Sequence, residues 1–110
     1  MEKSKIETYL GFCVRARKIT FGVDDIGSQK KGVFLLISDG GLSENSFKIM
    51  QKSQEKFACP LLVTNADALG ALLHKPAVKA VAIKDKNLAD AIIKASESES
   101  QFKLYSGGTN

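Results

Sequence analysis

The sequence has only two cysteines, one histidine and no long apolar run, and these absences exclude several kinds of protein. Cys13 and Cys59 lie far apart and form no CxxC pair, so together with the single His74 they do not supply a zinc site or a redox motif. Each cysteine is expected to be a small buried residue. No apolar run approaches the roughly 20 residues of a membrane helix, and the first residues lack a signal peptide's apolar stretch. We therefore expect a cytoplasmic protein with no membrane partner.

Motifs for catalysis on nucleotides or cofactors are also missing from the sequence. Gly107 and Gly108 do not belong to a GxxxxGK[ST] phosphate loop, and no glycine-rich turn between a strand and a helix predicts a methyltransferase cofactor site. His74 has no serine or cysteine placed beside it by a recognised motif. We expect a binding protein rather than an enzyme, with no catalytic residue, no metal site and no cofactor.

The composition favours one globular domain with an anionic partner. The chain has 110 residues, of which 44% are apolar and 25% are charged, as is typical of a single folded domain. Its formal net charge is +4 and its isoelectric point is near 9.1. Lysine and arginine release counterions from a phosphate backbone, so this charge favours an anionic partner without distinguishing RNA from DNA or a membrane surface.

Helices and short apolar strands alternate along the chain, which predicts a three-layer α/β/α sandwich. Strands are expected at residues 19–21, 33–37, 60–63 and 80–83, and helices are expected to start near residues 4, 23, 43, 64 and 87. The run at 33–37 is continuously apolar, as in a central strand covered on both faces, so Leu35 and Leu36 should be buried on opposite faces. Residues 1–95 are expected to form the domain, and residues 96–110 a flexible tail with little to bury.

Three stretches of the sequence share their order and spacing with a known family. The first is LGFCVRARKI at residues 10–19 followed by Gly22, and the second is LLISD at residues 35–39 leading into SENS at residues 43–46. The third is CPLL at residues 59–62, followed by LG at residues 69–70 and HK at residues 74–75. Together they resemble the kink-turn-binding ribosomal-protein family, in particular its small stand-alone bacterial members of the YlxQ type. The resemblance covers residues from about 4 to 95.

The resemblance implies a four-stranded mixed sheet between helical layers and an RNA-binding surface at one end of the sandwich. In relatives, a glycine and the polar residues at the start of the second helix meet the sheared G·A pairs of a kink-turn, a sharply bent RNA internal loop. The corresponding residues here are Gly22, Val23, Asp24 and Asp25. The family's apolar loop, which packs against an extruded nucleotide, corresponds to Pro76, Ala77 and Val78. A carboxylate at the first place can accept hydrogen bonds from the Watson–Crick edge of guanine.

The start of this second helix departs from the family pattern. The segment between Gly22 and Val33 is shorter than in typical kink-turn binders, and Asp24, Asp25 and Ser28 stand where those binders have asparagine, glutamate and lysine. Two adjacent carboxylates that face a polyanion are costly unless both accept hydrogen bonds. Ordinary stabilisation of a helix N-terminus is the alternative role of this pair.

Cationic residues are expected to flank the same end of the sandwich as Gly22, where they would position a phosphate backbone. They are Arg15, Arg17, Lys18, Lys30 and Lys31. Lysines at positions 48, 52 and 56 recur every four residues and form a second basic line, for which a solvated helix face is the simpler explanation. Residues 76–78 can be an exposed apolar loop or core packing at the entrance of a strand.

These observations predict RNA binding. We expect a ribosome-associated protein that recognises structured RNA, ribosomal or another non-coding RNA, and the resemblance implies a kink-turn as the target. The alternative is a protein-interaction adaptor that uses the same fold without RNA. Ionic strength separates the two, because binding through several lysines weakens steeply as salt is added, whereas binding through an apolar interface does not.

Overall fold

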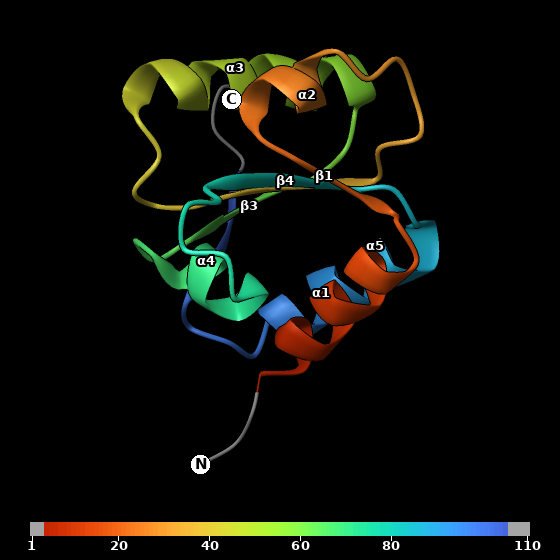
Figure 1. Cartoon of the computed structure of the whole chain (residues 1–110), viewed down its shortest axis with the longest axis vertical. Helices are drawn as coiled ribbons and strands as arrows, with labels where there is room; N and C mark the ends of the chain where they lie inside the picture. Colours follow the sequence, from red (N-terminus) through yellow and green to blue (C-terminus); the bar gives the residue numbers. More distant parts are fainter. Residues whose placement is uncertain (1–3, 106–110) are drawn as a thin grey trace.

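The chain folds into three layers, with a mixed β-sheet between two layers of helices (Figure 1). The computed structural model describes residues 4–105. The helices are α1 (Lys5–Arg15), α2 (Val23–Gly27), α3 (Glu44–Phe57), α4 (Ala68–Leu73) and α5 (Lys86–Ser96). The strands are β1 (Ile19–Phe21), β2 (Leu35–Ser38), β3 (Leu61–Thr64), β4 (Ala80–Ile83) and β5 (Phe102–Tyr105). The α/β/α sandwich predicted from the sequence is confirmed. In the stretch from 4 to 105, no helix has the length and apolar character needed to cross a membrane.

The strand directions decide which loops meet at each end of the sheet. The strand order is β1-β4-β2-β3-β5, with β2 and β3 parallel, β4 antiparallel to β1 and β2, and β5 antiparallel to β3. Strands β1, β2 and β3 therefore run one way, and β4 and β5 run the other way. The segments that follow the first three strands share one end of the sheet with the segments that precede β4 and β5.

Each end of the sheet is named here after one residue. The Gly22 end carries Gly22 and the loops 39–43, 65–67, 74–79 and 97–101. The Lys30 end carries the loops 16–18, 28–34, 58–60 and 84–85. In the view of Figure 1, the loops of the Gly22 end lie to the left and those of the Lys30 end lie to the right.

A separate hydrophobic core fills the space on each face of the sheet. One core lies between the sheet and α1, α4 and α5, and the other lies between the sheet and α2 and α3 (Figure 1). Leu35 belongs to the first core and Leu36 to the second, and both are 0% exposed, which confirms the prediction for the central strand. Cys13 and Cys59 are buried in the first and second core respectively, as predicted.

Side-chain caps explain where the three longest helices begin. In each case an oxygen of the residue before the helix accepts a hydrogen bond from a backbone amide of the first turn, which would otherwise have no partner. The pairs are Ser4 with Ile6 at 3.1 Å, Ser43 with Ser46 at 3.2 Å and Asp85 with Leu88 at 2.8 Å. The first two of these helices begin where the sequence predicts them, near residues 4 and 43. The last helix begins slightly earlier than expected because Asp85, rather than a residue at 87, is its cap.

The C-terminal part of the chain differs from the prediction. The expected flexible tail from residue 96 onward contains the end of α5 and a fifth strand, so the sheet has five strands rather than four. Phe102 is only 5% exposed and belongs to the first core, which lies against α1, α4 and α5 and is called the α1-side core below. The Tyr105 ring contacts the Phe47 ring edge to face at a centroid distance of 5.2 Å. These two aromatic residues supply the apolar area that the prediction missed. Residues 106–110 of the expected tail lie outside the described residues.

Candidate nucleic-acid interface

Gly22 joins β1 to α2 at the end of the sheet that the family resemblance points to. Its φ of +89° lies in the left-handed region, which favours glycine. Its amide donates to the Ala80 carbonyl at 3.0 Å, and this bond places the start of α2 beside the loop that leads into β4. The two segments that the resemblance associates with kink-turn RNA, residues 22–25 and 76–78, therefore both belong to the Gly22 end.

The side chains of these two segments face solvent to different degrees. Asp24 and Asp25 are exposed in the first turn of α2, and neither carboxylate has a hydrogen-bond or ion-pair partner among residues 4–105. Pro76 and Ala77 are exposed, whereas Val78 is half-buried and packs against the α1-side core. The loop thus combines both expectations, with an apolar exposed tip and a core residue at the entrance of β4.

Asp39 ties the loops of the Gly22 end together from inside the protein. Its side chain is buried and accepts four hydrogen bonds, which come from the amides of Gly41 (2.8 Å), Asp67 (2.8 Å) and Leu69 (3.0 Å) and from the hydroxyl of Thr64 (3.1 Å). Burial by itself would raise the pKa of this carboxyl, but the hydrogen bonds to its charged form outweigh burial and hold the pKa below its ordinary value. Asp39 is therefore a structural carboxylate rather than one available to a ligand.

The lysines in the loops of the Gly22 end already have partners. Lys79 lies 2.7 Å from Asp67 and 3.8 Å from Asp39, and its hydrogen bond to Asp67 is the main reason that its pKa is raised. The Lys75 ammonium lies 5.9 Å from the centre of the Phe21 ring. Since Asp24 and Asp25 are exposed at the same end, the Gly22 end is a poor surface for a phosphate backbone.

The predicted basic residues do not flank Gly22, and in this respect the prediction was wrong. Arg15, Arg17 and Lys18 lie at the end of α1 and in the loop before β1, whereas Gly22 follows β1. Lys30 and Lys31 lie in the loop that returns the chain to the start of β2. Both groups therefore lie at the Lys30 end. A strand moves the chain roughly 3.3 Å per residue, so residues on either side of β1 emerge at opposite ends of the sheet.

The Lys30 end gathers a larger set of cations than the sequence indicated. They come from four separate segments of the chain, namely Arg15, Arg17, Lys18, Lys30, Lys31, Lys56, Lys84 and Lys86. The carboxylates near them are Glu55, Asp85 and Asp90. Asp85 accepts the Leu88 amide as a helix cap, and Asp90 lies 3.1 Å from the Lys86 ammonium. The excess of positive charge at this end is therefore large.

A groove of about 440 Å³ crosses the Lys30 end. Its walls come from the loop before β2, from the end of α3 with the loop after it, and from the first half of α5, so it reaches from one helical layer to the other across the end of the sheet. Lys30, Lys31, Lys56 and Lys86 line it, and Asp90 is the carboxylate among its lining residues. A volume of this size can hold a small ligand or part of a larger one.

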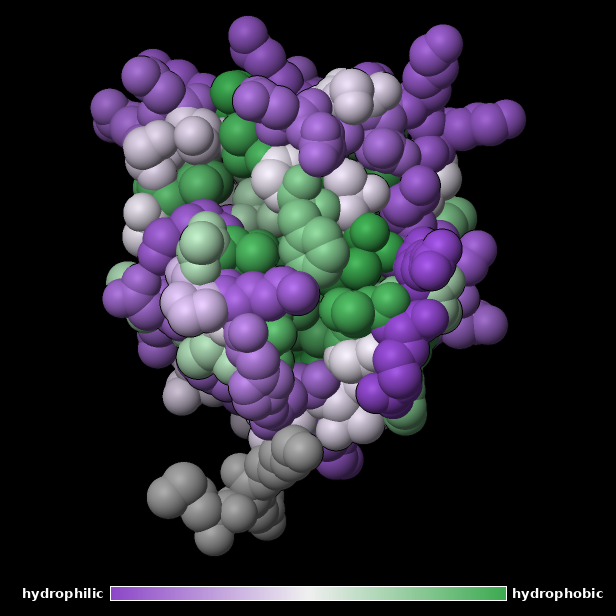
Figure 2. Space-filling view, in the orientation of Figure 1, coloured by the Kyte–Doolittle hydropathy of each residue, from purple (hydrophilic) through white to green (hydrophobic). Residues whose placement is uncertain are grey.

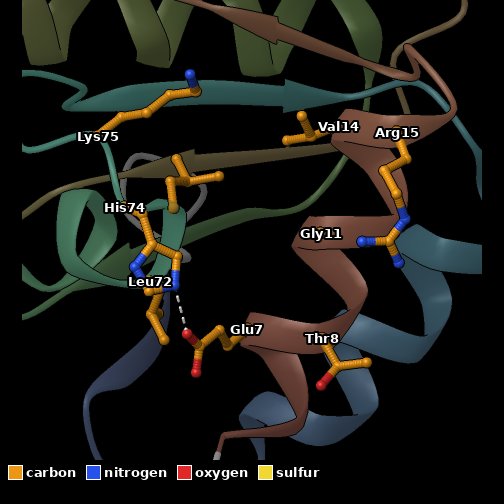
Figure 3. A pocket seen from close by; sticks show the side chains of 9 residues that line it. Glu7, Thr8, Gly11, Val14, Arg15, Leu72, His74 and Lys75 are labelled. Carbon is orange, nitrogen blue, oxygen red and sulfur yellow. Dashed lines mark hydrogen bonds and ion pairs between the residues drawn. The ribbon is translucent and has the colours of Figure 1, made fainter.

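A second hollow of about 420 Å³ lies between α1 and the end of α4 (Figure 3). Its polar groups are largely engaged with one another or with rings. Nε2 of His74 lies 2.7 Å from the carboxylate of Glu7, and the Arg15 guanidinium lies 5.0 Å from the centre of the Phe12 ring. Figure 2, in the orientation of Figure 1, shows apolar side chains in the middle of this face of the molecule with hydrophilic residues around them. This hollow offers less unpaired charge than the groove at the Lys30 end.

Comparison with known proteins supports the fold and does not assign a family. No family model matches the chain, and no curated protein matches it. One similar solved structure is described as that of a protein with unknown function from Bacillus halodurans C. The TM-score is 0.71 at 19% sequence identity, and the match covers 86% of this chain and 99% of the other. A likeness at this identity shows a shared fold.

Several residues of the basic surface were not predicted as site residues. The sequence indicates Lys56 only as part of a lysine line on one helix, and Lys84 and Lys86 are not among the predicted site residues. Lys56 occupies the last turn of α3, where it reaches the Lys30 end, whereas Lys48 lies earlier on the same helix. Charge at the ends of helices and strands, rather than periodicity along one helix, is the signal that would have found these residues.

Proposed function

We propose that this protein binds structured RNA and that the Lys30 end is the surface that contacts the RNA backbone. The observation that supports the proposal is the convergence of Lys30 and Lys31 with Arg17, Lys18 and Lys86 from other segments of the chain. The partner is a cytoplasmic RNA, such as ribosomal RNA or another structured non-coding RNA. Its phosphate backbone would contact the cations, and it would also contain unpaired nucleotides. The activity is binding, without a catalysed reaction.

The arrangement of the cations at the Lys30 end explains why this surface would bind RNA. Each neutralised phosphate releases condensed counterions, so several lysines and arginines on one surface give an affinity that single charges do not. The ammonium groups of Lys30 and Lys31 have no hydrogen-bond or ion-pair partner in the described part of the chain, so phosphate does not have to displace a carboxylate there. The loops that carry them are anchored on a rigid sheet, which fixes their spacing.

A kink-turn is one candidate target within this proposal, and it would meet the protein differently from what the resemblance implies. The segments at residues 22–25 and 76–78 lie at the Gly22 end, where the carboxylates are exposed and the loop lysines have partners. An RNA that used both ends would have to pass along a helical layer. The backbone contacts that carry most of the affinity belong to the Lys30 end in either case.

Salt dependence tests this proposal. The double variant Lys30→Ala, Lys31→Ala should weaken binding to a structured RNA and make the plot of log affinity against log salt shallower by about 1–2 units, because up to two phosphate contacts disappear. Lys48→Ala with Lys52→Ala is the matched control, since it removes the same charge from exposed positions of α3 outside the groove.

The outcomes separate the competing functions. If both double variants change the slope equally, the phosphate surface is not the Lys30 end. If the unmodified protein binds no RNA, or binds a protein partner with an affinity that salt does not alter, the adaptor function replaces RNA binding.

A further inference from the structure

We infer that the groove at the Lys30 end holds one unpaired nucleotide of an RNA strand, with its base against the ring of Phe34 and its phosphates near Lys30, Lys31 and Lys86. This inference rests on the proposed function and specifies the part of the RNA that is recognised. The occupant is identified by its chemistry, an aromatic base linked to an anionic backbone.

The position of Phe34 is the first observation. Its neighbours Val33 and Leu35 are buried, whereas Phe34 is 39% exposed and belongs to neither hydrophobic core. Its amide donates to the Ile83 carbonyl at 2.9 Å, so the ring is carried by backbone that is fixed to the sheet rather than by a free loop. The exposed part of this apolar ring can still be buried by a ligand, and the fixed backbone that carries it lowers the entropy cost of binding.

The ring of Phe34 also differs from the other phenylalanine rings near cations. Phe12, Phe21 and Phe57 each have an arginine or lysine over the ring at 5.0, 5.9 and 5.2 Å from the centroid respectively. No such cation covers Phe34 in the stretch from residue 4 to 105. Phe34 therefore lines the groove without a cation over its ring, while lysines line the groove around it.

The lysines of the groove suit the phosphate group of a nucleotide. Lys56 forms one wall, where its ammonium donates to the Gly27 carbonyl at 3.0 Å and lies over Phe57. Lys86 is held by Asp90 at 3.1 Å, and Lys30 and Lys31 stay exposed beside them. Lysines beside an open aromatic face are the combination by which proteins bind single strands, with stacking for the base and cations for the backbone.

The same geometry argues against an intact duplex as the occupant of the groove. In an A-form helix the base faces are stacked on each other, so an aromatic side chain reaches a base only where the strand is unpaired. Duplex RNA can meet the surrounding lysines through its phosphates but cannot use Phe34. The two kinds of RNA should therefore respond differently to loss of the ring.

The test compares Phe34→Leu with Phe12→Leu, which removes an exposed phenylalanine ring outside the groove. Binding of the full chain is measured by fluorescence anisotropy with an unstructured RNA of about eight nucleotides and with a fully paired RNA. Phe34→Leu should weaken binding to the single strand by about 5- to 150-fold, as expected for the loss of one stacked base, and leave duplex binding unchanged. Phe34→Tyr should restore single-strand binding because it keeps the ring.

The results that overturn this inference differ from those that overturn the proposed function. If Phe34→Leu behaves like Phe12→Leu while Lys30→Ala with Lys31→Ala still weakens binding, the basic surface stands and the base-binding groove is wrong. If uridine monophosphate competes for the groove as well as the single strand does, the occupant is a free nucleotide and the assignment to an RNA strand is wrong. Thermal melting of Phe34→Leu should match that of the unmodified protein, since the ring lies outside both cores.

Discussion

Asp39 is the residue on which the loops of the Gly22 end converge. Its carboxylate is 2% exposed, and its four hydrogen bonds come from the loop after β2, from β3 and from the start of α4. A buried carboxylate is stable only when hydrogen bonds or a cation replace the water it has lost. Lys79, at 3.8 Å, adds a favourable charge without a direct hydrogen bond.

Replacement of this carboxylate should lower stability in a pH-dependent way. Asp39→Asn brings an amide group toward backbone N–H donors, so we expect a loss of about 1–3 kcal/mol in the free energy of unfolding at pH 7. The pKa of Asp39 is lowered in the folded state, so its contribution is fully present above the unfolded value near 3.9 and is lost as pH falls through the folded value. The difference between the two proteins should therefore shrink below about pH 4.

Urea unfolding from pH 7 to pH 3 measures this difference. Asp24→Asn is the matched control, because Asp24 is exposed and its carboxylate has no partner among the described residues. A penalty for Asp39→Asn that is constant over this pH range would contradict the assignment of the effect to the charged form of the carboxylate.

Strand β5 is the element of this fold that the sequence did not predict. It adds an antiparallel edge to β3, and burial decreases along one face of the strand, from Phe102 at 5% exposed to Leu104 at 62% exposed. The two positions are therefore a natural pair for testing whether the strand contributes to stability.

Phe102→Ala should lower the free energy of unfolding by about 3–5 kcal/mol, because it leaves a cavity in the α1-side core. Leu104→Ala, on the same strand, should change the free energy of unfolding by no more than about 0.5 kcal/mol, since its side chain has little buried area to lose. Thermal or urea unfolding of the two variants gives the comparison. Equal, small effects would mean that the strand is not packed on the core.

The helices and central strands could be predicted because their signals are local. Ser4 and Ser43 precede apolar residues at helical spacing, which predicts where two helices begin. The run around Leu35 is apolar without alternation, which predicts a strand buried on both faces. β5 could not be predicted in the same way. Phe102 and Tyr105 follow a stretch rich in serine and glutamate, and only the open edge of β3, a feature of the folded protein, gives them a partner.

The candidate site was harder to predict because it depends on strand direction. The sequence indicated the cations of residues 15–18 and 30–31, but not the end of the sheet at which they lie. Lys84 and Lys86 follow β4, and they join Lys30 only because β4 is antiparallel to β2. A crossover to a parallel strand would have placed them at the Gly22 end. Direction is set by contacts between distant segments, which leave no local mark in the sequence.

At the scale of the whole molecule, the protein is electrically asymmetric. The Lys30 end carries unpaired lysines and arginines, whereas the Gly22 end carries exposed carboxylates and lysines that already have partners. Such an asymmetry orients an approaching polyanion before contact and raises the rate of association. The strands that separate the two ends have four residues or fewer, a span of roughly 13 Å, which exceeds the Debye length of about 8 Å at physiological salt.

The separation of the two ends of the sheet allows a test of which end binds RNA. If RNA binds at the Lys30 end, the exposed carboxylates of Asp24 and Asp25 make no contact with it and salt weakens their repulsion, so Asp24→Ala with Asp25→Ala should change the affinity for kink-turn and duplex RNA by less than about twofold at physiological salt. Loss of the two carboxylates from the first turn of α2 should lower stability by about 0.3–1 kcal/mol each. Titrations of both RNAs, with melting curves of the variant, measure the two effects.

The same titrations expose the opposite arrangement through the sign of the change. If RNA binds at the Gly22 end by general attraction, removing the carboxylates relieves repulsion and strengthens binding to both RNAs. If Asp24 or Asp25 accepts hydrogen bonds from guanine there, binding to the kink-turn alone weakens, by roughly tenfold to a hundredfold for a charge-assisted bond. Either change would contradict an RNA surface confined to the Lys30 end. We expect neither, because the exposed, partner-free lysines that can hold phosphate lie at the opposite end of the sheet from the first turn of α2.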